Sequence, residues 1–281
     1  MMQRALSTHL FVNHRLTTVW LERVWQAGIP LVELFCAQQH LDYRNKAQIS
    51  ELGHWFRDAE LKLHSLHSPM FSDDVWGRSG PNAVVSITEP VKARRIQAVD
   101  EVKRAIEIAE SVPFGYLVQH LGVTGEEYDE RKIDAAFSSL EEICLFARHR
   151  GVEVLLENTP NALASAEKLL LFFEVTHLDL NVCFDVGHAH MRGSIENEFR
   201  MLKPRIRSSH IHDNNGKEDL HLFPEAEGGS IEWATAMRVL RSAGQEFPLM
   251  LELREVAEMA HPLDEVNRVF ERLEGLKSSH E

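Results

Sequence analysis

Acidic and imidazole side chains recur along this sequence at the ends of short apolar runs. Carboxylate oxygens and imidazole nitrogens are common ligands of divalent metal ions in proteins. If the apolar runs are strands, their ends could bring these side chains to one rim around a shared ion. Nine such side chains are His67, His120, Glu157, Asp185, His188, His210, Asp219, His221 and Glu252.

Three pairs of residues are close enough in sequence to serve the same ion or adjacent ions: Asp185 with His188, His210 with His212, and Asp219 with His221. Gly187 lies inside the first pair and favours a tight turn after a strand. The second pair points the same way, because strand side chains alternate with a period of two. His212 is either a group that orients a ligand or a substrate contact.

The composition is that of an ordinary globular protein, with 44% hydrophobic and 26% charged residues in 281. The three cysteines are odd in number and far apart, which favours a reduced cytoplasmic protein over a disulfide framework. The N-terminal segment lacks the apolar stretch of a signal peptide, and no apolar run reaches the roughly 18 residues needed to span a membrane. The formal net charge of −13 disfavours a nucleic acid partner, although a local basic face could coexist with it.

Apolar extended runs alternate with segments of helical periodicity along the whole chain. Strands are predicted over 5–12, 30–35, 61–67, 115–120, 152–157, 180–185, 206–212 and 248–253. Asn161 and Ser230 are predicted N-caps of helices over 162–174 and 231–243. Eight strand–helix units at this length predict an α/β fold, a (β/α)8 TIM barrel formed by a single domain over 1–281. A doubly wound sheet is the alternative, but no GxGxxG follows the first predicted strand.

The carboxyl ends of the strands share one rim in such a barrel, and that rim carries catalysis. The connection 68–91 after the third predicted strand is unusually long. It is either a lid, with Trp76 or Arg78 touching the substrate, or a solvent-exposed loop that takes no part in the site. Glu33, near the end of the second predicted strand, is either a substrate contact or a buried acid paired with an arginine.

Several segments resemble the xylose-isomerase-like TIM barrels, a superfamily of sugar-phosphate isomerases and epimerases, inosose dehydratases and endonuclease-IV-like AP endonucleases. The resemblance covers residues 5–275, and its motifs separate the superfamily's branches poorly. The segments that carry it are LHSLHSP (63–69), VQHLG (118–122), LLENTP (155–160), FDVGHAH (184–190), HIHDN (210–214), DLHLFPEAEGGSIEW (219–233) and LMLEL (249–253).

The resemblance implies a core metal site formed by Glu157, Asp185, His210 and Glu252. In the epimerase branch, the glutamates that match Glu157 and Glu252 also exchange protons with the carbon beside the carbonyl. In the AP endonuclease branch, three zinc ions are held with the help of five further ligands, which match His67, His120, His188, Asp219 and His221.

Two departures from the family pattern disfavour the nuclease branch. The family usually has GEG after the DxH segment, whereas this chain has EAEGG over 225–229, so the backbone near a substrate phosphate would differ. After His67, the tyrosine often found in the AP endonucleases is missing. Asp73 and Asp74 would instead place negative charge near a phosphodiester.

The preferred hypothesis is therefore an enzyme, a divalent-metal-dependent isomerase or epimerase of a sugar, sugar phosphate or related polyol ketone. The ion would polarise the carbonyl and stabilise the enediolate, while Glu157 and Glu252 serve as base and acid. Zn²⁺, Mn²⁺, Co²⁺ or Mg²⁺ fits the mixed donors. One ion is expected, and the donors present could hold up to three.

Three alternatives remain open at this point. An inosose-dehydratase-like lyase would use the same ion and the same acids. An AP endonuclease would use zinc to hydrolyse a phosphodiester at abasic DNA. A barrel without activity would bind a sugar or a metal only. The expected partner is a small carbohydrate, with no membrane, and a homo-oligomer is left open.

Overall fold

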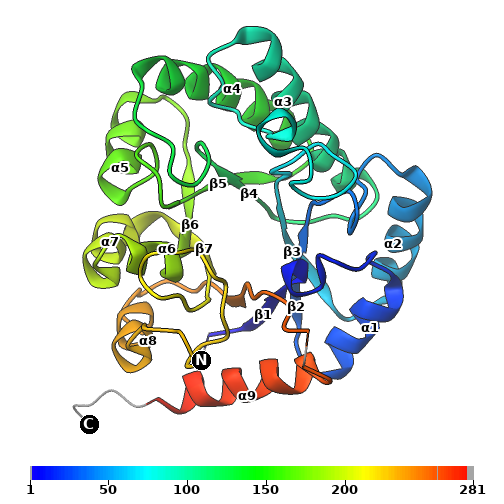
Figure 1. The fold of residues 1–281 in the computed structure, drawn as a ribbon. Helices are drawn as coiled ribbons and strands as arrows, with labels where there is room; N and C mark the ends of the chain where they lie inside the picture. The colour runs from blue at the N-terminus through cyan, green and yellow to red at the C-terminus, as the bar shows by residue number, and fades with distance from the viewer. Residues whose placement is uncertain (1, 258, 277–281) are drawn as a thin grey trace.

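The computed structural model describes residues 2–257 and 259–276. Eight parallel strands form a ring at the centre of the molecule, with helices around the outside (Figure 1). The strands are β1 (Arg4–Ser7), β2 (Leu31–Phe35), β3 (Lys62–His67), β4 (Tyr116–His120), β5 (Glu153–Glu157), β6 (Asn181–Asp185), β7 (Ile206–His210) and β8 (Leu249–Leu251). The predicted (β/α)8 barrel is thus confirmed.

The ring closes between its two end strands. The strand order runs β7-β6-β5-β4-β3-β2-β1-β8, so closure requires β7 to meet β8. Ile211, just after β7, pairs in parallel with Leu251. The Ile211 N–H donates to the Met250 carbonyl at 2.8 Å, and the Glu252 N–H donates to the Ile211 carbonyl at 3.1 Å. These bonds hold Glu252 beside the end of β7.

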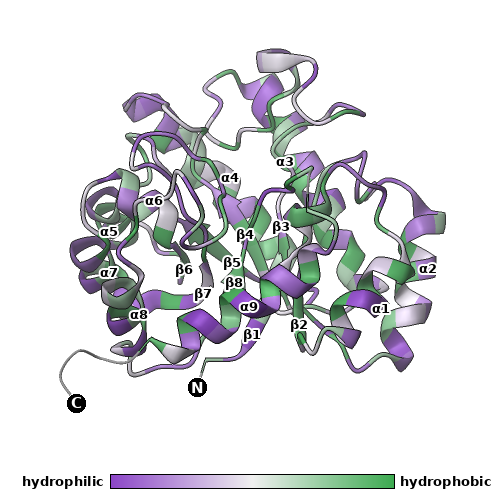
Figure 2. Ribbon diagram, turned by 60° about the horizontal axis from the view of Figure 1, so that its bottom comes forward, coloured by the Kyte–Doolittle hydropathy of each residue, from purple (hydrophilic) through white to green (hydrophobic). Residues whose placement is uncertain are grey.

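Nine helices surround the barrel in the part of the chain that the structure describes, and their polar faces point outward (Figure 2). They are α1 (Thr18–Gln26), α2 (Lys46–Asp58), α3 (Lys92–Ile106), α4 (Glu130–Arg148), α5 (Ala166–Val175), α6 (Val186–Met191), α7 (Ile195–Leu202), α8 (Trp233–Arg241) and α9 (Pro262–Gly275). Within the described ranges, none of these helices is both long and apolar enough to cross a membrane.

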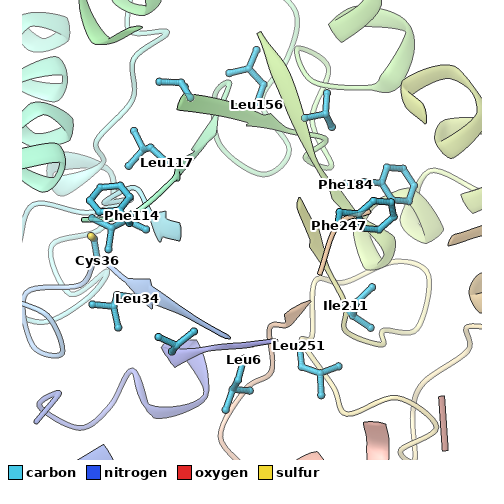
Figure 3. Close-up of a cluster of buried hydrophobic side chains, with 14 of the residues drawn as sticks. Leu6, Leu34, Cys36, Phe114, Leu117, Leu156, Phe184, Ile211, Phe247 and Leu251 are labelled. Carbon is cyan, nitrogen blue, oxygen red and sulfur yellow. The ribbon is translucent and has the colours of Figure 1, made fainter. Parts of the chain in front are cut away.

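Alternation along each strand separates two layers of side chains. Leu117, Leu156 and Phe184 belong to the large core between the strands and the helices, as Figure 3 shows for the labelled side chains around the ring. The neighbouring residues point to the other face, where Val118, Leu155 and Cys183 form a small separate cluster inside the barrel. The polar residues at the rim continue this inner row.

The first predicted strand is shorter than expected. It ends at Ser7, and Thr8–Phe11 form a 3₁₀ turn instead of continuing to residue 12. The Phe35 N–H donates to the Thr8 hydroxyl at 2.9 Å, so a side chain takes the place of a backbone acceptor from β1. Local side-chain bonds of this kind compete with strand pairing.

The two predicted N-caps were wrong by a few residues. The helix α5 begins at Ala166, and the Ser165 hydroxyl caps it by accepting from the Lys168 N–H at 3.2 Å. Asn161 instead accepts from the N–H groups of Leu163 and Ala164 in a turn before the helix. Likewise, α8 is capped by the Glu232 carboxylate rather than by Ser230.

The long connection 68–91, called the lid loop from here on, is folded rather than loose. Phe71 and Val84 form an antiparallel bridge, and the Ser72 N–H donates to the Ala83 carbonyl at 2.7 Å. The loop therefore doubles back as a short hairpin, which presents Trp76 from between its arms.

Candidate metal centre

The rim residues continue the inward row of each strand. His120 follows Val118 by two positions on β4, and Glu157 pairs in register with both His120 and Cys183. Asp185 likewise pairs in register with His210. Because parallel strands in register end at the same level, the strand ends bring these side chains to one place. The structure assembles the nine predicted ligands into three groups.

The first group, called the core group, consists of Glu157, Asp185, His210 and Glu252. The Nδ1 atom of His210 lies 3.2 Å from Glu157 Oε1, 3.4 Å from Glu252 Oε2 and 4.0 Å from Asp185 Oδ2. All four side chains are buried. Three carboxylates and one imidazole therefore face a common point, a donor set suited to a divalent cation.

The second group shares Glu157 with the core group. His120 Nε2 lies 2.9 Å from Glu157 Oε2, and His67 Nε2 lies 3.6 Å from the same oxygen. The two Nε2 atoms are 3.2 Å apart. One oxygen of Glu157 thus faces these histidines, while the other faces the core group, which is how a carboxylate bridges two neighbouring positions.

The third group, called the outer group, consists of His188, His212, Asp219 and His221. His188 Nε2 lies 3.1 Å from Asp219 Oδ2, and His221 Nε2 lies 3.3 Å from Asp219 Oδ1. His188 lies on α6, whereas the other three lie in the segment after β7. His212, which the sequence left as an orienting group or a substrate contact, is a full member of this group.

The buried charges of the core group depend on one another. Burial alone would raise the pKa of the Glu157 carboxyl, but the His210 and His120 imidazoles hold that pKa well below its ordinary value. Burial would lower the pKa of His210, yet Cys183 and the Glu252 carboxylate raise it well above its ordinary value. Protons on the imidazoles therefore balance the carboxylates in this arrangement, and a divalent cation could take over that role.

Three buried atoms at the centre have no hydrogen-bond partner among the described residues: Asp185 Oδ2, His212 Nε2 and Asp219 Oδ1. Buried polar atoms are rarely left unpaired, because each costs about 1–3 kcal/mol. All three can donate a lone pair to a cation. The residues present therefore fit a divalent metal.

Glu33 lies below the rim and is completely buried. Its carboxylate lies 3.1 Å from His210 Nε2 and accepts a hydrogen bond from the Ser65 hydroxyl at 2.8 Å. The partner is thus a histidine, in place of the arginine considered from the sequence. Because Glu33 occupies Nε2, it turns Nδ1 of His210 toward the core group, an arrangement typical of metal-binding histidines.

An aromatic wall formed by His9, Phe35 and Trp76 stands beside the ligands. Phe35 stacks on His67 at 4.6 Å between ring centroids. Trp76 meets Phe35 edge-on at 5.4 Å and His9 at 5.7 Å. The sequence pattern does not single out His9, which falls inside the first predicted strand, 5–12, and lies in the 3₁₀ turn after β1. Arg78 is exposed on the lid loop, and no contact joins it to the ligands within the described residues.

A cavity of about 270 Å³ opens next to His120, between the lid loop and β4. Phe71, Val84 and Gln119 contribute to its lining. The His120 side chain is 15% exposed, whereas His67 and Glu157 are at most 2% exposed. His120 is therefore the partly open side of the second group.

Most of the chain, including all of the ligand groups, matches a known protein family. Residues 21–276 match the family described as xylose isomerase-like TIM barrel. The chain is 26% identical over 268 residues to the uncharacterised protein MJ1311 of Methanocaldococcus jannaschii, covering 91% of this chain and 85% of that protein. A shorter match, 32% identical over 113 residues, is to a probable endonuclease 4 of Natranaerobius thermophilus and covers 38% of this chain and 39% of that one.

Solved structures share the fold. A D-tagatose 3-epimerase-like protein superposes with a TM-score of 0.77 at 24% identity, covering 98% of both chains. The IOLI protein with a bound zinc atom superposes with a TM-score of 0.74 at 17% identity, covering 97% of this chain and 98% of that one. At such identities the likeness shows a common barrel.

Proposed function

The chain belongs to the xylose isomerase-like TIM barrel family, and from this premise we propose that it is a divalent-metal-dependent isomerase or epimerase. Its substrate would be a sugar, a sugar phosphate or a related polyol ketone. One observation carries the proposal. The core group is buried in the barrel mouth and combines one imidazole with three carboxylates, two of which, Glu157 and Glu252, come from separate strands.

Glu157, Asp185, His210 and Glu252 would hold the ion. When bound, the ion would polarise the substrate carbonyl and so acidify the neighbouring carbon. Zn²⁺, Mn²⁺, Co²⁺ and Mg²⁺ are all candidates for this donor set.

The two glutamates differ in how they are held. Both oxygens of Glu157 are engaged, with Oε2 at 2.9 Å from His120 and Oε1 at 3.2 Å from His210. Within the described residues, the Glu252 side chain makes no hydrogen bond, and its Oε2 lies 3.4 Å from His210 Nδ1. The Glu252 carboxylate is therefore less restrained by hydrogen bonds than that of Glu157 and is better placed to act as the base.

We assign the proton transfers accordingly. Glu252 removes the proton from the carbon beside the carbonyl. Glu157, supplied from solvent through the partly exposed His120, returns a proton to the other face of that carbon or to the adjacent one. General acid–base transfer of this kind contributes about 10²–10⁴-fold, so orientation and charge stabilisation must supply the rest.

The surroundings favour a small substrate. In the aromatic wall, His9 and Phe35 are buried, and the partly exposed Trp76 is the ring that could pack against the carbon side of a sugar. Asp73 and Asp74 on the lid loop add negative charge near the entrance.

The test is solvent deuterium exchange. The metal-loaded protein is incubated in D₂O with a panel of ketoses, inososes and sugar phosphates, and deuterium at the carbon beside the carbonyl is measured by NMR. We expect exchange with at least one substrate, loss of it in E252Q, and retention in the control E255Q, since Glu255 pairs instead with His14 and Asn13 at the surface. A panel without exchange, or full exchange in E252Q, would reject the proposal. Net loss of water from an inosose would indicate the lyase chemistry instead.

Phosphodiester hydrolysis at abasic DNA is the second candidate, and one observation favours it. Glu157 is shared by two ligand groups and a third group lies beside them, as in enzymes that use clustered ions on phosphate esters. Three tightly bound zinc ions per chain, together with incision of abasic duplex DNA that weakens with salt, would establish this function over the first.

A further inference from the structure

The His212 imidazole lies in a space that is open because Gly187 has no side chain. Its side chain is fully buried, two positions beyond His210. A Cβ atom on Gly187 would overlap the His212 imidazole ring, so this ring fills the space of an absent side chain at the start of α6. The Asn214 amide donates to the Gly187 carbonyl at 2.9 Å and ties the two segments together. Gly187 therefore leaves room for the His212 ring, which any larger residue would displace.

The three histidines of the outer group share one pattern of ring contacts. The Nδ1 atom of His188 lies 3.0 Å from the Asn158 carbonyl, and that of His221 lies 3.0 Å from the Glu252 carbonyl. In His212, Nδ1 lies 3.4 Å from the Asp213 carbonyl. A carbonyl can only accept, so Nδ1 carries the hydrogen in each ring.

Nε2 of each ring is consequently the nitrogen that faces the outer group and is free to bind a cation. These atoms lie around Asp219, with His188 Nε2 at 3.1 Å, His221 Nε2 at 3.3 Å and His212 Nε2 at 3.7 Å from its carboxylate oxygens. His212 Nε2 also lies 3.2 Å from Asp185 Oδ2, on the side of the core group. His212 Nε2 and Asp219 Oδ1 are buried and have no hydrogen-bond partner among the described residues. One atom from each of His188, His212, Asp219 and His221 lies within 4.8 Å of the others, and a cation among them would satisfy both unpaired atoms.

We propose that His188, His212, Asp219 and His221 form a closed four-coordinate site for Zn²⁺ or a similar ion, with His212 as the fourth ligand. Structural zinc sites have four protein ligands, whereas catalytic sites leave one position open for water or substrate. The resemblance to known families supplied three of these donors as additional ligands. His212 changes their role, because it fills the position where a substrate oxygen would otherwise bind.

A closed site at this position has a structural task. It joins α6 to the segment that follows β7, and it fixes His221, whose positive φ of 48° is unusual for a residue other than glycine. The inference is independent of the reaction at the core group, since it requires only that the outer group holds an ion.

The experiment compares metal binding in the wild type, H212N and the control H190N. His190 lies in the same turn as His188, but its Nε2 contacts the Ser230 hydroxyl rather than the outer group. Cobalt replaces zinc, and a competing chelator sets the free ion concentration. We expect H212N to lose affinity at one site by at least about tenfold and to lose the intense visible absorption of four-coordinate cobalt. H190N should retain both.

Unchanged affinity and an unchanged cobalt spectrum in H212N would overturn the proposal. If H212N does not fold, NMR of the wild type decides the matter. Zinc should shift the Nε2 resonance of His212 together with those of His188 and His221, and an unshifted His212 would reject it as a ligand. The core-group variant E252Q should keep this signature, so failure of the proposed reaction and failure of the closed site remain distinguishable.

Discussion

At the residue scale, each metal-facing atom depends on what holds the opposite end of its side chain. The clearest case is Glu33, which accepts a hydrogen bond from the Ser65 hydroxyl and holds Nε2 of His210. A ligand ring held in this way is oriented before any ion arrives, so less rotational freedom is lost on binding. The buried acid of β2 is therefore part of the metal centre although it does not face the common point.

Replacing Glu33 should weaken metal binding at the core group. E33L removes the partner of His210 Nε2 and should lower the affinity by about 10–100-fold, whereas E33Q keeps an acceptor oxygen and should lose less. Chelator competition with Mn²⁺ or Co²⁺ measures both. Equal affinity in the wild type and E33L would show that the orientation of His210 does not depend on Glu33.

At the element scale, the segment after β7 is organised by one carboxylate. Asp213 Oδ1 accepts from the N–H groups of Asn214 at 2.8 Å and Ser230 at 3.0 Å, and Oδ2 accepts from the Trp233 indole at 2.7 Å. A Cβ on Gly229 would press on this carboxylate. The EAEGG segment (225–229) thus supplies, at Gly229, the glycine that leaves room for the Asp213 carboxylate.

Removing Asp213 should destabilise the whole barrel. D213A leaves several buried N–H groups unpaired, and the free energy of unfolding should fall by about 3 kcal/mol or more. Urea denaturation checks this. The control D134A, at an exposed site on α4, should stay within about 0.5 kcal/mol of the wild type. A similar small change in D213A would contradict the role given to this residue.

The lid loop should act as a cover over the ligands. Trp76 packs on Phe35, which in turn stacks on His67. W76A should therefore speed the removal of metal by EDTA severalfold, with a smaller change in equilibrium affinity. W55A, on α2, provides the control, because Trp55 packs on Phe56. Identical stripping rates in W76A and the wild type would mean that ions leave by another path.

The sequence predicts most strand ends and the side chains that lie together there, because alternation fixes which residues face the barrel interior. The first strand is the exception, since it ends at Ser7 rather than at residue 12. Asp185 and His210 could be placed together on that basis alone. The pairing of Glu33 with His210 could not, since it joins residues 177 positions apart across the barrel. The role of His212 likewise depends on space left by Gly187 on another element. Such contacts depend on tertiary packing, which the local pattern of residue types in the sequence does not predict.

At the scale of the whole molecule, the barrel buries several carboxylates at one end of its axis. Without a cation, Glu157, Asp185 and Glu252 repel one another in a poorly solvated place and depend on protonated histidines for balance. A metal ion that binds only the folded state stabilises it by about 2.7 kcal/mol at a free concentration 100 times its Kd. Metal occupancy should consequently govern thermal stability.

Chelation should lower the Tm of the metal-loaded protein by about 5–10 °C, given about 2–4 °C per kcal/mol for a chain of this size. In D185N the same treatment should have a smaller effect, because the ion binds less tightly. The metal-free D185N protein should be less stable than the metal-free wild type, since the neighbouring His188 and His212 hold the pKa of Asp185 below its ordinary value and lose their partner. Calorimetry with and without EDTA measures all four states. A Tm insensitive to EDTA would show that the ligands fold correctly without an ion.

The carboxylate of Glu157 serves two neighbouring positions at once, one oxygen to each. An ion that settles between His67 and His120 must draw electron density from the same group that the core ion uses. The two occupancies are then thermodynamically linked, and each alters the affinity of the other by the same factor. How readily one position fills would therefore depend on the supply of the ion at the other.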